Sequence, residues 1–150
     1  MMLPPPLDAH AHIRVDVSAA DIRSLNAVVL ASTRSLDEAE RAMSRQDAAA
    51  VWGVGCHPGL AKAQQGFDEL RFRELLSRTA LISEVGLDGA SRVPMSTQRE
   101  SFRSILAIGS EMSRIASVHS YKAQNDVLDV IEETAATGVV LHWWLGDQAQ

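Results

Sequence analysis

The sequence predicts an α/β protein built on parallel strands. Short apolar runs recur along the whole chain and alternate with stretches that have the hydrophobic spacing of amphipathic helices. Runs such as Ala27–Ser32 ("AVVLAS") are almost continuously apolar, which is typical of a parallel sheet buried on both faces. The connections between the elements are short, as in chains of βα units. This alternation leaves two architectures open, a doubly wound sheet and a (β/α) barrel.

The predicted strands cover Leu7–Ile13, Asn26–Ser32, Ala49–Gly55, Leu81–Val85, Ile115–His119 and Gly138–Trp143. Helix starts are predicted at Ser35–Glu38 ("SLDE") and Thr97–Glu100 ("TQRE"), because each pairs an N-cap hydroxyl with a Glu three residues later. Further helices are predicted at Phe67–Arg78 and at Asn125–Gly138, the latter ended by Gly138. The chain has no linker or low-complexity tract, so we expect a single domain over residues 1–150.

Composition narrows the functional classes. The chain is 46% hydrophobic and 22% charged, as expected of a globular protein with a real core. Its single cysteine, Cys56, has no partner for an internal disulfide, which fits a reducing compartment. No secretory leader is visible and no apolar run approaches the about 18 residues needed to span a bilayer, so we expect a cytoplasmic protein without membrane contact. The net charge of −5 disfavours a protein that coats DNA, although bound cations would offset it locally in an enzyme.

All five histidines fall at or just after the end of a predicted strand. His10 and His12 alternate with apolar residues in "LDAHAHI", so on a strand they share one face, together with Asp8. The others are His57, His119 and His142. In parallel α/β folds the carboxyl ends of the strands carry the ligand sites. The histidines are therefore expected to converge.

Acidic residues join this set at the fourth predicted strand. Glu84 lies late in "LISEVG", and Asp88 follows just beyond it. Imidazole and carboxylate suit Zn²⁺, Mn²⁺ and similar ions, and a carboxylate can bridge two of them. The expected metal ligands are His10, His12, Glu84, His119 and His142, which are enough for two divalent ions of the Mg, Mn or Zn type.

Each of these residues also has a purely structural interpretation. Glu84 could be an ion-paired core residue, although a buried unpaired carboxylate is costly. His57 and Asp88 could shape turns or cap a helix instead of facing substrate, and Trp143 and Trp144 could simply pack. Cys56 beside His57 could suggest a nucleophile pair, but adjacent strand residues point to opposite faces.

Taken together, the motifs "DAHAHI", "GCHPG", "SEVGLDG", "STQRESF", "SVHSYKA" and "VLHWWLG" resemble the TatD family of metal-dependent deoxyribonucleases in their order and spacing. The resemblance covers nearly the whole chain. It implies a TIM-like (β/α) barrel of the metallo-dependent hydrolase type and hydrolysis of phosphodiester bonds in DNA by a metal-activated water. The variants "GLDGAS" and "LHWW" look most like the TatD-like nuclease of the Qat anti-phage (antiviral) defence cassette.

The resemblance also implies roles for individual residues. His10 and His12 would bind one metal, Glu84 would bridge both, and His119 and His142 would hold the second, so that Glu84, His119 and His142 form the catalytic set. His57 and Asp88 match further motif positions and would contact substrate or support the ligands. Lys122 is the cation nearest the fifth strand end and would also contact substrate, although it points elsewhere if that strand continues.

The sequence departs from the family pattern in three ways. Tyr121 stands where the family usually has an Arg, a natural phosphate clamp, and Ser83 replaces the usual Gly before the bridging Glu. The chain supplies about six of the eight βα units of a closed barrel. We therefore expect an incomplete barrel, truncated at the C-terminus, that lacks a last Asp ligand. The chain could be a fragment of a longer protein or a truncated gene product, or a second copy of the chain or a partner in a defence complex could cover the open edge.

Two alternatives to a nuclease remain at this stage. One is a related amidohydrolase-type enzyme acting on a small substrate, although many such barrels use a bridging Lys and this chain has only Lys62 and Lys122. The other is a catalytically impaired module that binds metal or a partner, supported by the missing Arg and the short C-terminal part.

Overall fold

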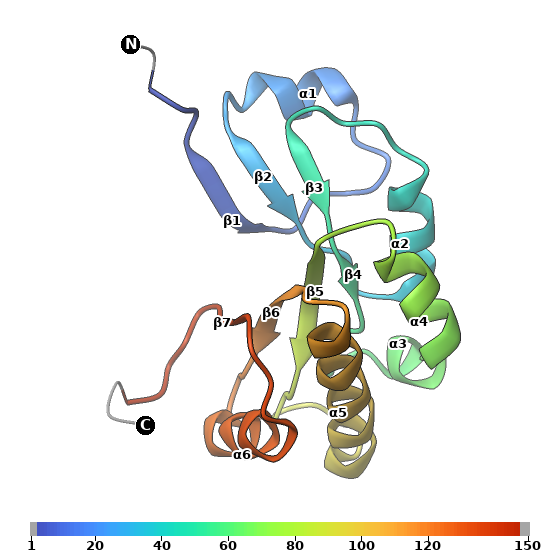
Figure 1. Ribbon diagram of the computed structural model, residues 1–150, viewed down its shortest axis with the longest axis vertical. Helices are drawn as coiled ribbons and strands as arrows, with labels where there is room; N and C mark the ends of the chain where they lie inside the picture. The colour runs from blue at the N-terminus through green and yellow to red at the C-terminus, as the bar shows by residue number, and fades with distance from the viewer. Residues whose placement is uncertain (1–2, 148–150) are drawn as a thin grey trace.

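The structure is a computed structural model that describes residues 3–147 (Figure 1). The strands are β1 (Leu7–Ala11), β2 (Val28–Ala31), β3 (Ala50–Trp52), β4 (Val54–Gly55), β5 (Leu81–Gly86), β6 (Ile115–His119) and β7 (Val139–Leu141). The helices are α1 (Ala19–Ser24), α2 (Leu36–Met43), α3 (Ala61–Gln65), α4 (Glu69–Leu76), α5 (Met95–Glu111) and α6 (Gln124–Thr134). The predicted α/β class is confirmed. Residues 1–2 and 148–150 of the predicted domain lie outside the described range.

Every strand pairing in the described chain is parallel. One sheet has the order β1-β2-β3 and the other the order β4-β5-β6-β7. In Figure 1, α2, α3, α4 and α5 lie along one side of the strands, and both chain ends lie toward the opposite side. Over residues 3–147, β1 and β7 are the outer strands and do not pair with each other. The barrel is therefore open, as predicted.

The strand predicted at 49–55 is divided at Gly53 into β3 and β4. Thr33 accounts for this break, because its hydroxyl donates to the Gly53 carbonyl and accepts from the Gly55 amide. A Cβ on Gly55 would lie 1.8 Å from the Thr33 carbonyl oxygen, so only glycine allows the two segments to approach this closely. The two sheets meet along this contact.

The core consists of two apolar clusters. The larger one lies between the four-stranded sheet and its helices, where Phe72 of α4 and Phe102 of α5 are almost fully buried. The smaller one packs α1 and α2 on the three-stranded sheet through Ile22, Val29 and Trp52. The larger cluster fixes the position of β5, on which the site is built.

Several sequence predictions about helix ends need correction. The Ser35 side chain caps α2 by accepting from the Glu38 amide, as predicted. Thr97, however, lies inside α5, which begins at Met95 with Pro94 in the N-cap position and without a side-chain cap. α6 ends at Thr134 with Ala135 in the left-handed conformation, before Gly138. The short helices α1 and α3 were not predicted.

Within residues 3–147, no helix combines the length and apolar character needed to cross a membrane.

Candidate metal centre

Glu84 is the centre of the site, and the backbone of β5 is distorted where it lies. The pairing of β5 with β6 shifts register between Ile82 and Val85, and Glu84 has a φ of 47°, in the left-handed region. This conformation costs a non-glycine residue about 1–3 kcal/mol, and bulges of this kind redirect a side chain. The Glu84 side chain is only 3% exposed. The fold thus accepts local strain to bury one carboxylate among the histidines.

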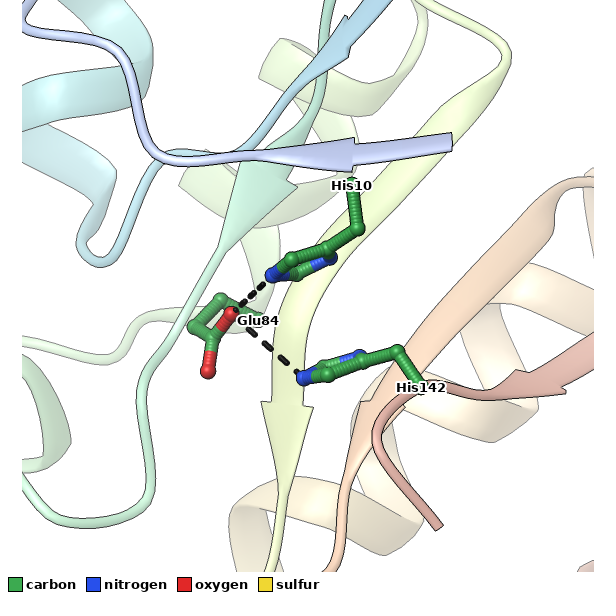
Figure 2. A group of neighbouring side chains, drawn as sticks. All are labelled: His10, Glu84 and His142. Carbon is green, nitrogen blue, oxygen red and sulfur yellow. Dashed lines mark ion pairs between the residues drawn. The ribbon is translucent and has the colours of Figure 1, made fainter. Parts of the chain in front are cut away.

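One carboxylate oxygen, Oε2, faces the first and last strands. The Nε2 atoms of His10, His12 and His142 lie 2.8, 3.1 and 3.7 Å from it. The rings of His10 and His142 are stacked, with centroids 3.9 Å apart, and Figure 2 shows both pointing at the same oxygen. The Nε2 atoms of His10 and His12 are 3.3 Å apart. The alternation in "DAHAHI" therefore brings both rings to one point, as predicted.

The other oxygen, Oε1, faces a second set of rings. His119 Nδ1 lies 3.2 Å from it and His57 Nε2 lies 3.5 Å from it. The far nitrogen of His119, Nε2, is 3.5 Å from Asp88 Oδ2. Asp88 thus lies beside the site, close to the ring of His119.

Two buried serines hold the rings on the Oε2 side. Ser117 Oγ is 3.0 Å from His10 Nδ1 and 2.8 Å from His142 Nδ1, and Ser32 Oγ is 3.2 Å from His10 Nδ1. The Ser117 hydroxyl has one hydrogen and can donate to only one ring, so at least one ring donates to it. A ring that donates from Nδ1 keeps the lone pair on Nε2, which is the form a metal requires.

His57 differs from the other histidines in its hydrogen bonding. The Gly59 amide donates to His57 Nδ1 over 2.9 Å. A neutral ring that accepts at Nδ1 carries its proton on Nε2. His57 therefore presents a hydrogen-bond donor to Glu84 Oε1 in this conformation, which favours contact with an anion over metal ligation.

The electrostatics of the site suit a bound cation. Burial alone would raise the pKa of Glu84, but the imidazoles of His10, His119 and His142 outweigh it and hold that pKa well below its usual value. Burial lowers the pKa of His12 and of His57, which favours their neutral rings. The site therefore combines an ionised Glu84 with rings of His12 and His57 that favour the neutral form.

Unsatisfied atoms give an independent test of whether a metal fits. Glu84 Oε2 and His119 Nε2 are buried without a hydrogen-bond partner, although imidazole nitrogens crowd Oε2 at short distances. Buried polar atoms are normally paired, and a cation bound between the ring nitrogens and the carboxylate would satisfy them. The residues present fit divalent metal ions.

The side chains around Glu84 form groupings beyond the expected one. Two groups of side chains that could hold a metal ion are His10–Glu84–His142 and His57–Glu84–His119, each with its ligand atoms within 4.8 Å of one another. His10, His12 and Glu84 lie at least as close, because the two Nε2 atoms are 3.3 Å apart and both lie within 3.1 Å of Glu84 Oε2. We expected His10 with His12 and His119 with His142. His142 joins His10 because Ser117 contacts both rings, whereas His119 turns toward the other carboxylate oxygen. Glu84 belongs to both groups.

Other candidates lie apart from this centre. Lys122 Nζ is 5.5 Å from the Tyr121 ring centroid, and no contact within the described chain joins it to Glu84 or the histidines. Cys56 is buried, and burial raises the pKa of its thiol to about 12, which disfavours a role as nucleophile. Trp143 is exposed.

Ser32 and Ser117 were missed by the sequence analysis. The signal for Ser117 was present, because it lies two residues before His119 on β6 and so shares its face. Ser32 lies at the end of an apolar run, where a small polar residue carries no comparable signal.

The model of the family described as TatD related DNase matches residues 7–150. The chain belongs to the TatD family. Its fold is similar to the crystal structure of YJJV, a TatD homologue from Escherichia coli K12, with a TM-score of 0.78 and 14% identity over 97% of this chain. It is also similar to a hydrolase TatD family protein from Entamoeba histolytica, with a TM-score of 0.73 and 16% identity over 99% of this chain. No curated protein matches the sequence.

The matches to these TatD structures cover 62% and 61% of the two neighbours' own chains. This share agrees with the sequence prediction of a barrel with about six of its eight βα units. Because both identities are low, the neighbours show the TatD fold and not a shared substrate.

Proposed function

We propose that this TatD family chain holds two divalent metal ions and hydrolyses phosphodiester bonds in DNA. The observation that carries the proposal is the position of Glu84, whose two carboxylate oxygens face separate sets of imidazoles. A carboxylate that bridges two ions is the arrangement expected for phosphodiester displacement. DNA as the substrate class is inferred from the family to which the chain belongs.

Each residue of the site has its own role in the proposed reaction. Divalent ions held here would supply Lewis-acid activation of a water and of the phosphodiester. Glu84 stays ionised and would contribute to both metal sites. His10 and His142 would hold a metal ion on its Oε2 side, and His119 would hold one on its Oε1 side. The Nε2–H of His57 is available as a donor to a phosphate oxygen. Asp88 lies 3.5 Å from the far nitrogen of His119, where it would support that ring once a metal is bound.

The test is cleavage of end-labelled single- and double-stranded DNA by the purified full chain with Mn²⁺, Mg²⁺ or Zn²⁺. We expect metal-dependent cleavage that Glu84→Gln reduces at least about a hundredfold, because loss of the bridging charge weakens both ion sites. Glu111→Gln, at an exposed carboxylate on α5, is the matched control and should cleave normally.

Equal cleavage by wild type and Glu84→Gln would show that the activity does not belong to this site. Bound metal without cleavage of any DNA would overturn the nuclease proposal and favour a metal-binding module. In that case, metal-dependent hydrolysis of a small amide or ester would identify the amidohydrolase-type alternative.

A further inference from the structure

We propose that an arginine-lined cleft beside the metal centre binds the phosphates of the DNA strand next to the cleaved bond. This inference rests on the proposed function, because it assigns a strand path to the same site. The arginine cleft is lined by His12, Ile13, Arg14, Val15, Asp16, Ser32, Arg34, Glu38 and Arg41.

The arginine cleft has the size and position of a backbone subsite. Its volume is about 370 Å³, and its walls come from the segment after β1 and from β2 through α2. It opens directly onto the metal centre, because His12 lies in its wall with Nε2 at 3.1 Å from Glu84 Oε2. Ser32, which contacts His10, lies in the same wall. A strand with one phosphate at Glu84 would therefore continue past His12 into the cleft.

The charges of the cleft favour a polyanion. Three arginines face two carboxylates there, whereas the chain as a whole carries a net charge of −5. Guanidinium groups match phosphate oxygens through paired donors. A local cationic cleft in an acidic protein indicates where a nucleic-acid backbone can approach.

The three arginines are not equally available. Asp16 binds Arg14 through both Nε and Nη2, and Glu38 binds Arg34 at 2.8 Å. Arg41 has no ion pair within residues 3–147 and is exposed on α2. Exposed ion pairs contribute little to stability. The carboxylates of the cleft pair with Arg14 and Arg34, and neither forms an ion pair with Arg41. Arg41 is the residue most free to bind phosphate.

The test is the salt dependence of binding between the full chain and a fluorescently labelled oligothymidylate with cleavage-resistant phosphorothioate linkages, measured by fluorescence anisotropy. We expect Arg41→Gln and Arg34→Gln each to weaken binding about three- to tenfold at low salt. Each should also lower the slope of log K against log salt by about 0.7, the value for one lost phosphate contact on a single strand. An oligonucleotide with uncharged methylphosphonate linkages should show no difference between variants.

The matched control is Arg103→Gln, which removes the same charge from α5, where Arg103 pairs with Glu133. It should bind like the wild type. Because Arg41 has no ion pair to lose, its variant should also keep the wild-type unfolding midpoint, which separates a lost contact from a damaged fold. Unchanged affinity and slope in both cleft variants would overturn the inference, as would no binding by the wild type.

The two proposals fail in different ways. A chain that binds the charged oligonucleotide through Arg41 but cleaves no DNA keeps the cleft and refutes the nuclease. A chain that cleaves DNA with unchanged salt slopes in the cleft variants keeps the nuclease and refutes the cleft.

Discussion

Ser117→Ala should weaken one of the two metal groups selectively. Ser117 is only 5% exposed, and its Oγ lies 2.8 Å from His142 Nδ1 and 3.0 Å from His10 Nδ1. Removing the hydroxyl takes away the Nδ1 partner of His142, while His10 keeps Ser32 at 3.2 Å. The damage therefore falls mainly on His142.

The size of the effect follows from this geometry. A buried N–H left without a partner costs about 1–3 kcal/mol. At 25 °C this corresponds to roughly a 5- to 150-fold change in an equilibrium constant, which brackets the 10- to 100-fold losses typical when a partner of a metal-binding histidine is removed. The His10–Glu84–His142 group should weaken by this factor, and the His57–Glu84–His119 group should change little.

Isothermal titration of the metal-free chain with Mn²⁺ or Zn²⁺ measures both affinities. Ser110→Ala is the matched control, because Ser110 Oγ is also buried but has no hydrogen-bond partner. Ser32→Ala should fall between the two, since His10 keeps Ser117 as a second partner. Identical metal affinities in Ser117→Ala and Ser110→Ala would refute the reasoning that Ser117 prepares the ring nitrogens for a metal.

Three further predictions concern stability and reactivity. Arg45, with Trp52, lowers the pKa of Asp47, so the stability this carboxylate contributes is present above the unfolded-state value of about 3.9 and is lost as the pH falls through the lower folded-state value. In urea unfolding, Asp47→Asn should lower the free energy of unfolding by about 2 kcal/mol at pH 7 and by progressively less in acid. Asp16→Asn, in the exposed pair with Arg14, should cause no measurable loss. Equal losses in the two variants would contradict the argument that burial strengthens the Asp47 pair. Phe72→Ala should destabilise the fold by about 3–5 kcal/mol in the same assay, unlike a substitution at an exposed position of α4. Cys56 should resist iodoacetamide at pH 8 until the chain unfolds, because burial raises the pKa of its thiol to about 12, and rapid labelling of the folded chain would count against this.

Much of the fold could be predicted from hydrophobic patterning. The strand predicted at Ile115–His119 has the same bounds as β6. The division of 49–55 into two strands could not be predicted, because it depends on the Thr33 side chain reaching Gly53 and Gly55 from the loop after β2. The helices α1 and α3 are too short for a hydrophobic period to be visible.

The convergence of the histidines was also predictable, because parallel strands end on one side of a sheet. Their division between the two oxygens of Glu84 was not. It depends on the left-handed backbone of Glu84 and on the ring orientations set by Ser117 and Gly59, none of which leaves a mark in the spacing of motifs. Position along the chain thus predicts which residues meet, and hydrogen-bond partners decide what each one can do.

The contact between the two sheets makes the metal centre sensitive to partial unfolding. His10 and Ser32 belong to the three-stranded sheet or follow it, whereas Glu84, Ser117 and His142 belong to the four-stranded sheet or follow it. The centre is therefore complete only while both sheets remain docked. A partly unfolded copy would separate these side chains, so it would lose the metal site on which the proposed hydrolysis depends. Because the metal centre lies across the contact between the two sheets, metal binding requires that both sheets are folded and docked.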